Sequence, residues 1–402
     1  MQRPSRRDMV PALLGFCATL SLCFFLLTLW SQWGPVIGKG AGLLNAAGSP
    51  VGGDFSQFYV ASAVTRTQGA RHNYHESAYQ NEYQKIMGGN LDYRWVYPPS
   101  FLLLVAPLSL MPYTAALAVW LALTLTCYLL VMPRLPGRSL GVLLSLSFPA
   151  VFLNMLNGQN GFLTAGLWGA GLFLLKGRPF SAGLVLGCLS YKPQLALLLP
   201  LALAAGGHWR ALGGACLSAA GLVAVSSLVF GWSVWPEFWQ SLGRSLELLG
   251  KAGPLWEKMI SVYAAAMLAG LGQHWAWFLQ GSITVAVCGG VLWLWYAPGR
   301  ERLRYAGVVL GSLLVTPHAY YYDLVLLALP LAWLALEGLE QGWYPGEKVL
   351  LVLGWLVPLE AYPFHRVLWG LPLTPLVLTA LFLLTLRRHY RERQGAGAGP
   401  GT

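Results

Sequence analysis

The sequence is short of charged residues. Only 10% of its 402 residues are Asp, Glu, Lys or Arg, whereas 56% are hydrophobic. A soluble domain carries charge on about a quarter of its residues, so this composition excludes an ordinary soluble enzyme and a disordered protein. Lipid is therefore the main solvent of the chain, and we expect an all-α polytopic membrane protein.

Common catalytic and metal-binding motifs are also missing. The six cysteines lie in apolar stretches without a CxxC pair, which argues against a disulfide framework and a cysteine-bound metal. No GxSxG, HExxH, Walker or dinucleotide fingerprint occurs in a suitable context. The sequence therefore predicts neither a metal nor a cofactor.

Basic residues exceed acidic ones by 26 to 15, and many of them lie at the two ends. Basic tails that flank apolar spans are the signature of a cytoplasmic side. They explain the net charge of +11 without nucleic acid as a partner. The first apolar run, Val10–Trp30, then reads as a retained anchor rather than a cleaved signal peptide.

Apolar runs continue to the end of the chain and predict about 12 transmembrane helices of up to ~20 residues. We place them near residues 10–30, 97–132, 140–156, 161–175, 179–191, 194–206, 211–231, 259–296, 305–317, 320–337, 346–361 and 367–386. Residues 1–393 then form a single transmembrane domain, and the Gly-rich tail 394–402 is expected to be disordered. Several spans are short, which predicts a polar cavity inside the bundle.

Short basic loops set the expected orientation. The cytoplasmic loops are Pro133–Ser139, Lys176–Arg178, His208–Arg210 and Pro298–Arg304. The segments expected on the outer side of the membrane are then residues 31–96, Asn157–Gly161, Lys192-Pro193, 232–258, Thr316–Tyr320 and Glu360–Arg366. This scheme requires residues 97–132 and 259–296 each to cross once, so we expect a broken piece in both, the first at Met111-Pro112.

Two outer segments are not membrane spans. In residues 31–96, aromatic residues at helical spacing predict two amphipathic helices on the membrane surface. In residues 232–258, the tryptophans predict an aromatic loop at the lipid interface.

Asp54 follows two glycines at the start of the first amphipathic helix. It could cap that helix in a capping box with Gln57. Alternatively it is a general base held at the membrane face, since an ionisable residue beside a membrane is a functional hypothesis by default.

His318 lies in Thr316-Pro-His-Ala-Tyr-Tyr-Tyr-Asp323, where Pro317 ends a span. A histidine at a helix end is often structural, and the tyrosines, Tyr320 among them, suit a headgroup belt. However, His318 and Asp323 are expected on the same side as Asp54, which makes them candidate site residues.

Further candidates are polar residues at the breaks between apolar runs. Lys192 is either an interfacial lysine that snorkels to water or a phosphate-binding cation, and Arg94 is either a headgroup anchor or an anion contact. The turn Asn157-Gly-Gln-Asn-Gly161 contains Gln159 and Asn160, more polar groups than a turn requires. With these we group Tyr59, Tyr97, Gln159, Asn160, Tyr320 and Asp323 as candidate residues of a substrate cavity.

The order of these motifs resembles glycosyltransferase family 87, whose members are membrane mannosyltransferases of the GT-C type. The motifs are Gly53-Asp54-Phe55 with Tyr59, Tyr97-Pro98-Pro99, Gly158-Gln159-Asn160, Lys192-Pro193 and the Pro317 turn. The resemblance implies a GT-C-like bundle, Asp54 as the catalytic base and His318 in the same cavity. The segment His318–Asp323 departs from the Ser-Trp-rich version of the mannosyltransferase members.

The implied reaction is an inverting transfer of a hexose, mannose by family leaning, from a polyprenyl-phosphate donor to a glycolipid, polysaccharide or protein acceptor. A lipid phosphate is already a good leaving group, so the enzyme needs a base and phosphate-binding cations. Asp54 would be the base, His318 a helper, and Lys192 and Arg94 phosphate contacts. The resemblance also implies a prokaryotic inner membrane with the site facing outward.

Two other classes remain open. A transporter or lipid flippase would also have broken helices and polar residues near the midplane, and a structural membrane subunit would need no site. The large outer loop suits a reaction at the surface better.

Overall fold

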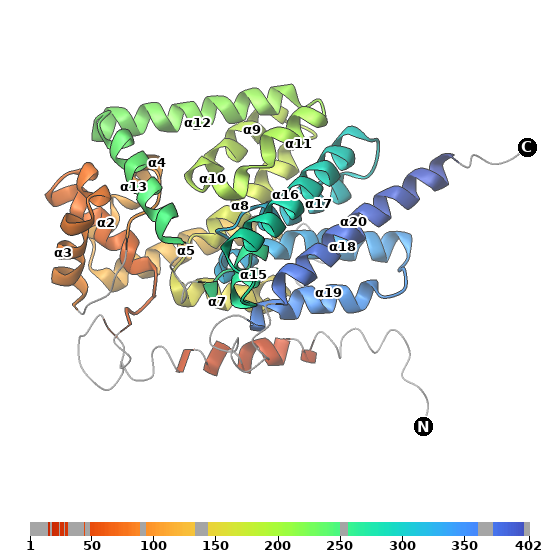
Figure 1. The fold of residues 1–402 in the computed structure, drawn as a ribbon, viewed down its shortest axis with the longest axis horizontal. Coiled ribbons are helices and arrows are strands. Elements are labelled where there is room, and N and C mark those ends of the chain that lie inside the picture. The colour runs from red at the N-terminus through yellow and green to blue at the C-terminus, as the bar shows by residue number, and fades with distance from the viewer. Residues whose placement is uncertain are drawn as a thin grey trace, which may run out of the picture.

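We examined the fold in a computed structural model, which describes residues 49–88, 94–132, 144–249, 256–360 and 373–397, with Leu44 and most of residues 15–30. The regular structure in these ranges is helical, with two isolated β-bridges and no strand. The all-α prediction is therefore confirmed for this part of the chain (Figure 1).

The helices follow one another with short connections. The first group is α2 (Phe55–Thr67), η1 (Ala70–Tyr74), α3 (Glu76–Met87), α4 (Pro99–Val105), η2 (Leu108–Leu110) and α5 (Tyr113–Val131). The second group is α7 (Pro149–Asn157), α8 (Gly161–Leu174), α9 (Pro179–Gly187), η4 (Cys188–Tyr191), α10 (Pro193–Ala196), α11 (Leu199–Ala205), α12 (Trp209–Phe230) and α13 (Val234–Leu249). The third group is α15 (Val262–Leu268), α16 (Gln273–Tyr296), α17 (Glu301–Val315), η5 (Tyr321–Leu327), α18 (Ala328–Gln341), α19 (Glu347–Leu356), η6 (Val357–Glu360) and α20 (Thr374–Gly397).

Four segments in the described ranges are long and apolar enough to cross a membrane: α5, α12, α16 and the continuous η5–α18 stretch Tyr321–Gln341. The expected breaks are present, because η2 ends before Pro112 and α15 precedes α16. The predicted number of 12 transmembrane helices is not confirmed. Several apolar segments, such as Gly161–Leu174 and Pro179–Tyr191, are too short to span ~30 Å alone.

Glycine allows close and extensive contact between helices α9 and α12. A Cβ on Gly183 would lie 1.9 Å from the carbonyl oxygen of Ala211, and one on Gly214 would lie 2.4 Å from that of Phe180. Small residues on both helices therefore bring the two backbones together, as is common between helices in lipid.

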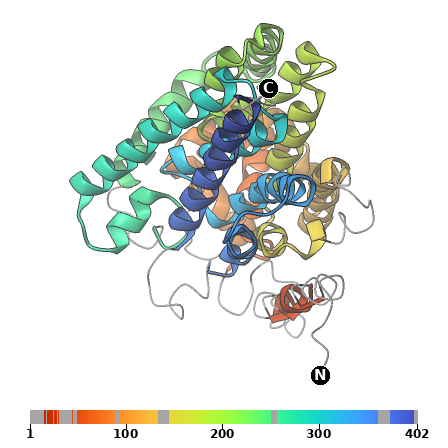
Figure 2. The same ribbon diagram turned by 90° about the vertical axis from the view of Figure 1, so that its right-hand side faces the viewer.

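A large apolar core occupies the middle of the bundle, where α17 packs against α16, α18 and α20. Beside it, the helical residues between 15 and 30 run along the outside of the bundle in two perpendicular views (Figures 1 and 2). The ring of Phe25 lies 4.6 Å from that of Phe152 in α7.

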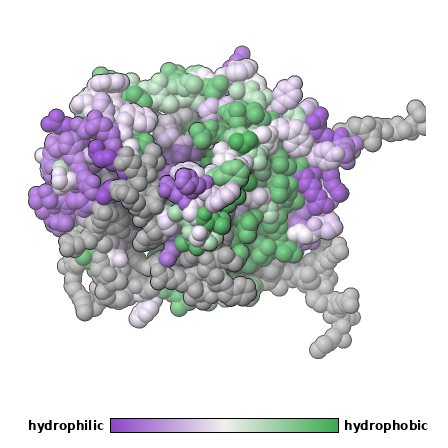
Figure 3. Space-filling model, viewed as in Figure 1, coloured by the Kyte–Doolittle hydropathy of each residue, from purple (hydrophilic) through white to green (hydrophobic). Residues whose placement is uncertain are grey.

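On the face shown in Figure 3, hydrophobic residues gather mainly between two hydrophilic ends, with a small hydrophilic patch among them. One end carries α2, α3 and α13, and the opposite end carries the loop before α17 and the C-terminal part of α20 (Figure 1). Three predicted basic segments, Lys176–Arg178, Pro298–Arg304 and the C-terminal tail, meet at this second end, where Lys176 pairs with Glu301 at 3.5 Å and Arg300 with Glu392 at 3.3 Å. We call the end with α2, α3 and α13 the α2 end, and the opposite end the basic end.

Two helices do form in the first outer segment, as predicted, but their apolar faces pack on protein. Phe55 and Phe58 of α2 and Tyr79 and Tyr83 of α3 are buried in one cluster with α4 and α5. These aromatic side chains are therefore covered by neighbouring helices rather than free to face lipid, and the position of the two helices on the membrane surface stays a prediction.

Two expected irregular segments are partly helical. Most of the predicted aromatic loop 232–258 is α13, whose Val234 and Phe238 join the same cluster while Trp239 is exposed. Helix α20 continues to Gly397, four residues into the predicted disordered tail, and Gln394 donates a hydrogen bond to the Tyr390 hydroxyl at 2.7 Å. Residues 398–402 lie outside the described residues.

Candidate active site

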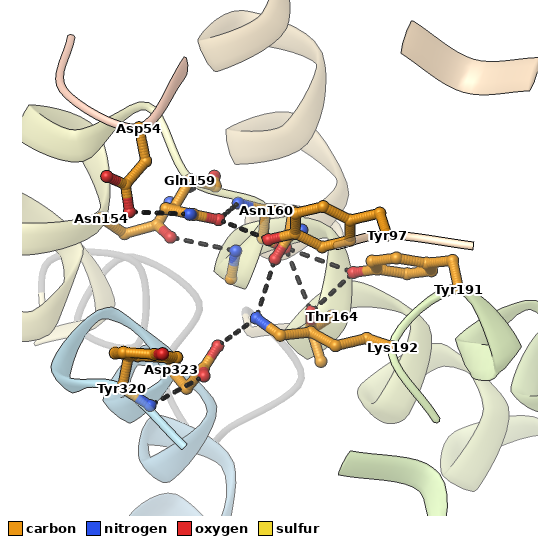
Figure 4. A network of polar contacts seen from close by, with 11 residues as sticks. Asp54, Tyr97, Asn154, Gln159, Asn160, Thr164, Tyr191, Lys192, Tyr320 and Asp323 are labelled. Carbon is orange, nitrogen blue, oxygen red and sulfur yellow. Dashed lines mark hydrogen bonds and ion pairs between the residues drawn. The ribbon is translucent and has the colours of Figure 1, made fainter. Parts of the chain in front are cut away.

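Polar residues from five segments that are distant in the sequence meet in one network (Figure 4), and Tyr97, which lies just before α4, is one of them. Asp54 precedes α2, Gln159 and Asn160 lie between α7 and α8, Lys192 lies between η4 and α10, and Asp323 lies in η5. Hydrogen bonds and one ion pair connect them in two linked groups, the Asp54–Gln159–Tyr97 group and the Asn160–Lys192–Asp323 group. We call the whole set the polar network.

The carboxylate of Asp54 does not cap its own helix. No hydrogen bond runs from the α2 backbone to this side chain, so the capping-box alternative is wrong. Instead Asp54 Oδ2 accepts a hydrogen bond from Gln159 Nε2 at 2.9 Å. Its Oδ1 receives no hydrogen bond from the described residues, which leaves one oxygen able to accept a proton.

Two glycine turns fit into each other and set this geometry. Gly52 and Gly158 have φ angles of 77° and 52°, which L side chains rarely adopt. A Cβ on Gly158 would lie 2.5 Å from Phe55 Cβ and 3.0 Å from the Gly52 carbonyl oxygen. The turn before α2 therefore rests directly on the turn after α7, and this contact places Asp54 next to Gln159.

The amide of Gln159 has only one orientation that fits its neighbours. Its Oε1 accepts hydrogen bonds from the Tyr97 hydroxyl at 3.2 Å and from the Asn160 backbone N–H at 3.1 Å. A backbone N–H can only donate, so Nε2 must face Asp54. Asn154 holds the turn from below, donating to the Gln159 carbonyl at 3.1 Å and accepting from Gly161 N–H at 3.0 Å.

Lys192 and Asp323 form a buried ion pair. Lys192 Nζ lies 2.5 Å from Asp323 Oδ1 and donates to Asn160 Oδ1 at 3.0 Å. Asp323 Oδ2 accepts from the Tyr320 backbone N–H at 3.1 Å. Both side chains are at most 3% exposed, so the alternative of a lysine that snorkels to water is wrong. This ion pair joins the chain between η4 and α10 to η5.

Burial dominates the electrostatics of Asp54. It raises the pKa of the carboxyl above its ordinary value, while the Gln159 hydrogen bond and the charges of Lys258 and Lys192 act in the opposite direction. A carboxylate with a raised pKa is a better proton acceptor than a free aspartate.

His318 lies in the turn between α17 and η5, and its backbone N–H donates to Thr316 Oγ1 at 3.2 Å. Burial lowers the pKa of its imidazole, which keeps the ring neutral at pH 7. The structure shows no hydrogen bond from this imidazole to the described residues, Asp54 included.

Two predicted site residues lie apart from the polar network. The Tyr59 hydroxyl donates to the Met111 carbonyl at 3.0 Å, and its ring packs on Tyr113. Arg94 pairs with Glu76 at 2.6 Å. It lines a surface hollow between η1, α3 and α13, formed by Asn73, Tyr74, Glu76, Tyr79, Arg94, Trp95, Ser241 and Arg244. This hollow is not at the polar network, where the sequence predicted a cavity.

Several network residues escaped the sequence analysis. Asn154 is a fully buried amide within an apolar helix, and that contrast was its only signal. The hydroxyl groups of Tyr191 and Thr164 share a hydrogen bond of 2.6 Å. One of them donates in it, and the other is left to donate to the Asn160 carbonyl, which is in reach of both. Lys258, outside the polar network, acts on the pKa of Asp54 through its charge, and nothing in its local sequence marked it.

Metal ligands do not cluster in the described part of the chain, since no group of three His, Cys, Asp or Glu side chains meets there. The polar network offers instead one unengaged carboxylate oxygen, buried amides and fixed positive charge. These groups can accept a proton and stabilise an anion.

Comparison with known families decides the class of chemistry. Residues 95–317, more than half of the chain, match the sequence model of glycosyltransferase family 87. The chain belongs to glycosyltransferase family 87. It is therefore a glycosyltransferase, and its apolar helices make it a multi-pass membrane enzyme. Searches among curated proteins and solved structures found no significant match.

The matched region of this glycosyltransferase contains Tyr97, Gln159, Asn160 and Lys192 but neither Asp54 nor Asp323. Those two acids are nevertheless bound directly to matched residues, Asp54 through Gln159 and Asp323 through Lys192. The polar network thus spans the boundaries of the family match.

Proposed function

We propose that the chain transfers a hexose, with mannose favoured, from a polyprenyl-phosphate donor to a hydroxyl group of a glycolipid or glycan acceptor. The observation that carries this proposal is the state of Asp54. Its Oδ2 is held by Gln159, its Oδ1 is unengaged among the described residues, and burial raises its pKa. A membrane glycosyltransferase needs such a base wherever its donor supplies its own leaving group.

The proposed step is a single inverting displacement. The acceptor oxygen attacks C1 of the sugar while Asp54 Oδ1 takes the hydroxyl proton. The C1–O bond to phosphate breaks, and its electron pair stays on the phosphate oxygen. The phosphodiester anion thereby becomes a polyprenyl phosphate dianion, which needs positive charge rather than a protein acid. The neutral imidazole of His318 is the proposed helper, as a hydrogen-bond donor to the phosphate.

The two polar ends suit this reaction. The basic end matches the positive charge expected of a cytoplasmic face, so the α2 end, with the polar network beneath it, faces outward in our proposal. A lipid-linked donor then enters laterally from the outer leaflet. We propose the prokaryotic inner membrane as the location.

The test is transfer of labelled mannose from polyprenyl-phosphate mannose in membranes that contain the full chain. We expect wild type to label an acceptor and Asp54→Asn to lower the rate by about 10²–10⁴-fold, the usual contribution of a general base. Glu82→Gln is the matched control, because Glu82 is a carboxylate at the same end that binds Lys85 and Gln68.

Other outcomes would change the proposal. Near-normal transfer by Asp54→Asn would refute the base assignment. Labelled donor that crosses the bilayer without covalent transfer would favour the carrier alternative. Transfer from a nucleotide sugar alone would refute the lipid-phosphate donor.

A further inference from the structure

The leaving phosphate needs a cation, and the two cations that the sequence suggests are already neutralised. Lys192 is paired with Asp323 at 2.5 Å, and Arg94 is paired with Glu76 at 2.6 Å. Arg94 also lies at the surface hollow, away from the polar network. A cation that already has a carboxylate partner attracts a phosphate much less, because the pair is nearly neutral at a distance.

A third cation, Lys258, is fixed to the segment that completes the polar network. Tyr321 N–H donates to the Lys258 carbonyl at 3.0 Å, and Ile260 N–H donates to the Ala319 carbonyl at 2.9 Å. Met259 and Tyr320 form an isolated antiparallel bridge between these two hydrogen bonds. We call this paired element the 258–260/319–321 clip.

The clip ties Lys258 to the polar network and to His318. Its Tyr320 donates a backbone hydrogen bond to Asp323 and lies on the network in Figure 4. His318 immediately precedes the clip. Lys258 is thus held on an element that has the network on one side and the candidate helper histidine at its end.

The charge of Lys258 acts on Asp54 and is not neutralised by a partner. Its effect on the Asp54 carboxyl is larger than that of Lys192. In the described residues its ammonium group has no ion pair, although the residue is half-buried. A half-buried ammonium without an ion-pair partner among the described residues is suited to an anion that arrives with the substrate.

Resting on the proposed function, we propose that Lys258 is the cation that binds the phosphate of the donor, and that Lys192 instead stabilises the fold through its ion pair with Asp323. During transfer the C1–O electron pair moves to the phosphate, whose charge changes from −1 to −2. Lys258 then stabilises the transition state more than the bound donor, which is the requirement for catalysis.

The experiment measures binding of undecaprenyl phosphate and of undecaprenol to the purified full chain in lipid nanodiscs. Wild type, Lys258→Met, Lys258→Arg and Lys85→Met are compared. Lys85 is the matched control, an exposed lysine of α3 at the same end that pairs only with Glu82. Transfer from polyprenyl-phosphate mannose is measured in parallel.

We expect Lys258→Met to weaken undecaprenyl phosphate binding by about 10–100-fold, the range of a hydrogen bond to a charged group. Undecaprenol binding should stay unchanged, Lys258→Arg should lie within about threefold of wild type because it keeps the charge, and Lys85→Met should bind like wild type. Wild-type phosphate affinity in Lys258→Met, or equal loss for phosphate and alcohol, overturns the assignment.

The same data separate this inference from the proposed function. If wild type transfers mannose and Lys258→Met keeps its phosphate affinity, the inference alone fails. If wild type neither prefers the phosphate over the alcohol nor transfers mannose, the lipid-phosphate donor fails and the inference fails with it.

Discussion

The two polar ends of the bundle differ in how their charges are paired. At the basic end, Arg300 contacts Glu337 at 2.8 Å, Arg302 contacts Glu340 at 2.6 Å, and Arg388 binds Glu347. Beneath the α2 end, Asp323 has Lys192 as its partner, but Asp54 has only the amide of Gln159. These three arginines of the basic end are in ion pairs, whereas the α2 end leaves a buried carboxylate without an ion-pair partner.

This difference separates charges that hold the fold from charges that are available for chemistry. A buried charge with an ion-pair partner is neutralised, and the protein is destabilised when that partner is removed. A buried carboxylate without such a partner has a raised pKa and is ready to bind a proton. By this criterion Lys192 and Asp323 resemble the basic end, although they lie beside Asp54.

The largest expected effect comes from breaking a closed pair at either end. Lys192→Met should lower the free energy of unfolding by about 3–5 kcal/mol, because it leaves the Asp323 carboxylate buried without a cation. Arg388→Met should have an effect of the same size, since Arg388 and Glu347 are also buried. Thermal unfolding of the purified variants, followed by circular dichroism, measures both.

A second substitution makes this prediction specific. Lys192→Met combined with Asp323→Leu should recover most of the lost stability, because the unpaired charge is gone. A Lys192→Met variant as stable as wild type would contradict the structural role of the pair.

The next effect concerns the interlocked glycine turns that hold Asp54. Gly158→Ala should lower the free energy of unfolding by about 1–3 kcal/mol, as overpacking does, because its Cβ would lie 2.5 Å from Phe55 Cβ. Transfer activity should fall further, since Gln159 is displaced. Gly213→Ala in α12 is the control, because a Cβ there meets nothing within 4 Å, and it should leave activity unchanged. Equal behaviour of the two variants would contradict this account.

The third prediction uses pH to examine the unpaired carboxylate. Below the raised pKa of Asp54, the transfer rate should fall about tenfold per pH unit as the base becomes protonated. Gln159→Leu should move this acid limb to higher pH, because it removes the hydrogen bond that lowers the pKa of Asp54. A rate–pH profile of Gln159→Leu with the wild-type limb would argue against Asp54 as the titrating group.

The raised pKa of Asp54 also determines how the stability of the fold depends on pH. The folded chain binds the Asp54 proton more tightly than the unfolded chain, so this group loses its stabilising contribution as pH rises through the folded-state pKa. Asp54→Asn removes the buried negative charge, and its melting temperature at pH 7 should equal or exceed that of wild type. A marked fall in melting temperature would place Asp54 with the structural charges instead.

The smallest effect belongs to the exposed part of the basic end. Arg302→Gln should lower the free energy of unfolding by only about 0.2–1 kcal/mol, because the Glu340 side chain of its closest pair is 47% exposed. The transfer rate should remain that of wild type. A loss of transfer activity in Arg302→Gln would mean that the two ends are coupled in function.

The apolar runs and the polar or proline-containing positions between them predicted the helical architecture, because lipid permits few alternatives to helices. The break at Met111-Pro112 is a clear example, since proline lacks the N–H that would continue the helix. The number of spans stays a prediction, because apolar runs do not reveal that several helices, such as Pro179–Gly187, stop after two or three turns. The faces of α2 and α3 were assigned to lipid because a pattern shows which face is apolar but not what covers it.

In the candidate site, single residues were predictable and their pairings were not. Asp54, Gln159 and Lys192 stood out because polar residues are rare in apolar surroundings. The ion pair of Lys192 with Asp323 joins positions 131 residues apart, and no local pattern encodes such a contact. Arg94 was grouped with Lys192 by charge alone, and the packing of α3 gives it Glu76 as a partner instead.

The hydrogen bond between Gln159 and Asp54 joins residues that are 105 positions apart, and this separation has a consequence for biosynthesis. At roughly 5–20 residues per second, the ribosome adds Gln159 about 5–20 s after Asp54. The ribosome adds Asp323 131 residues after Lys192. The nascent chain can therefore form the contact of Asp54 with Gln159 before it can pair its buried lysine, and a chain that stops short of Asp323 would carry Lys192 without its carboxylate partner.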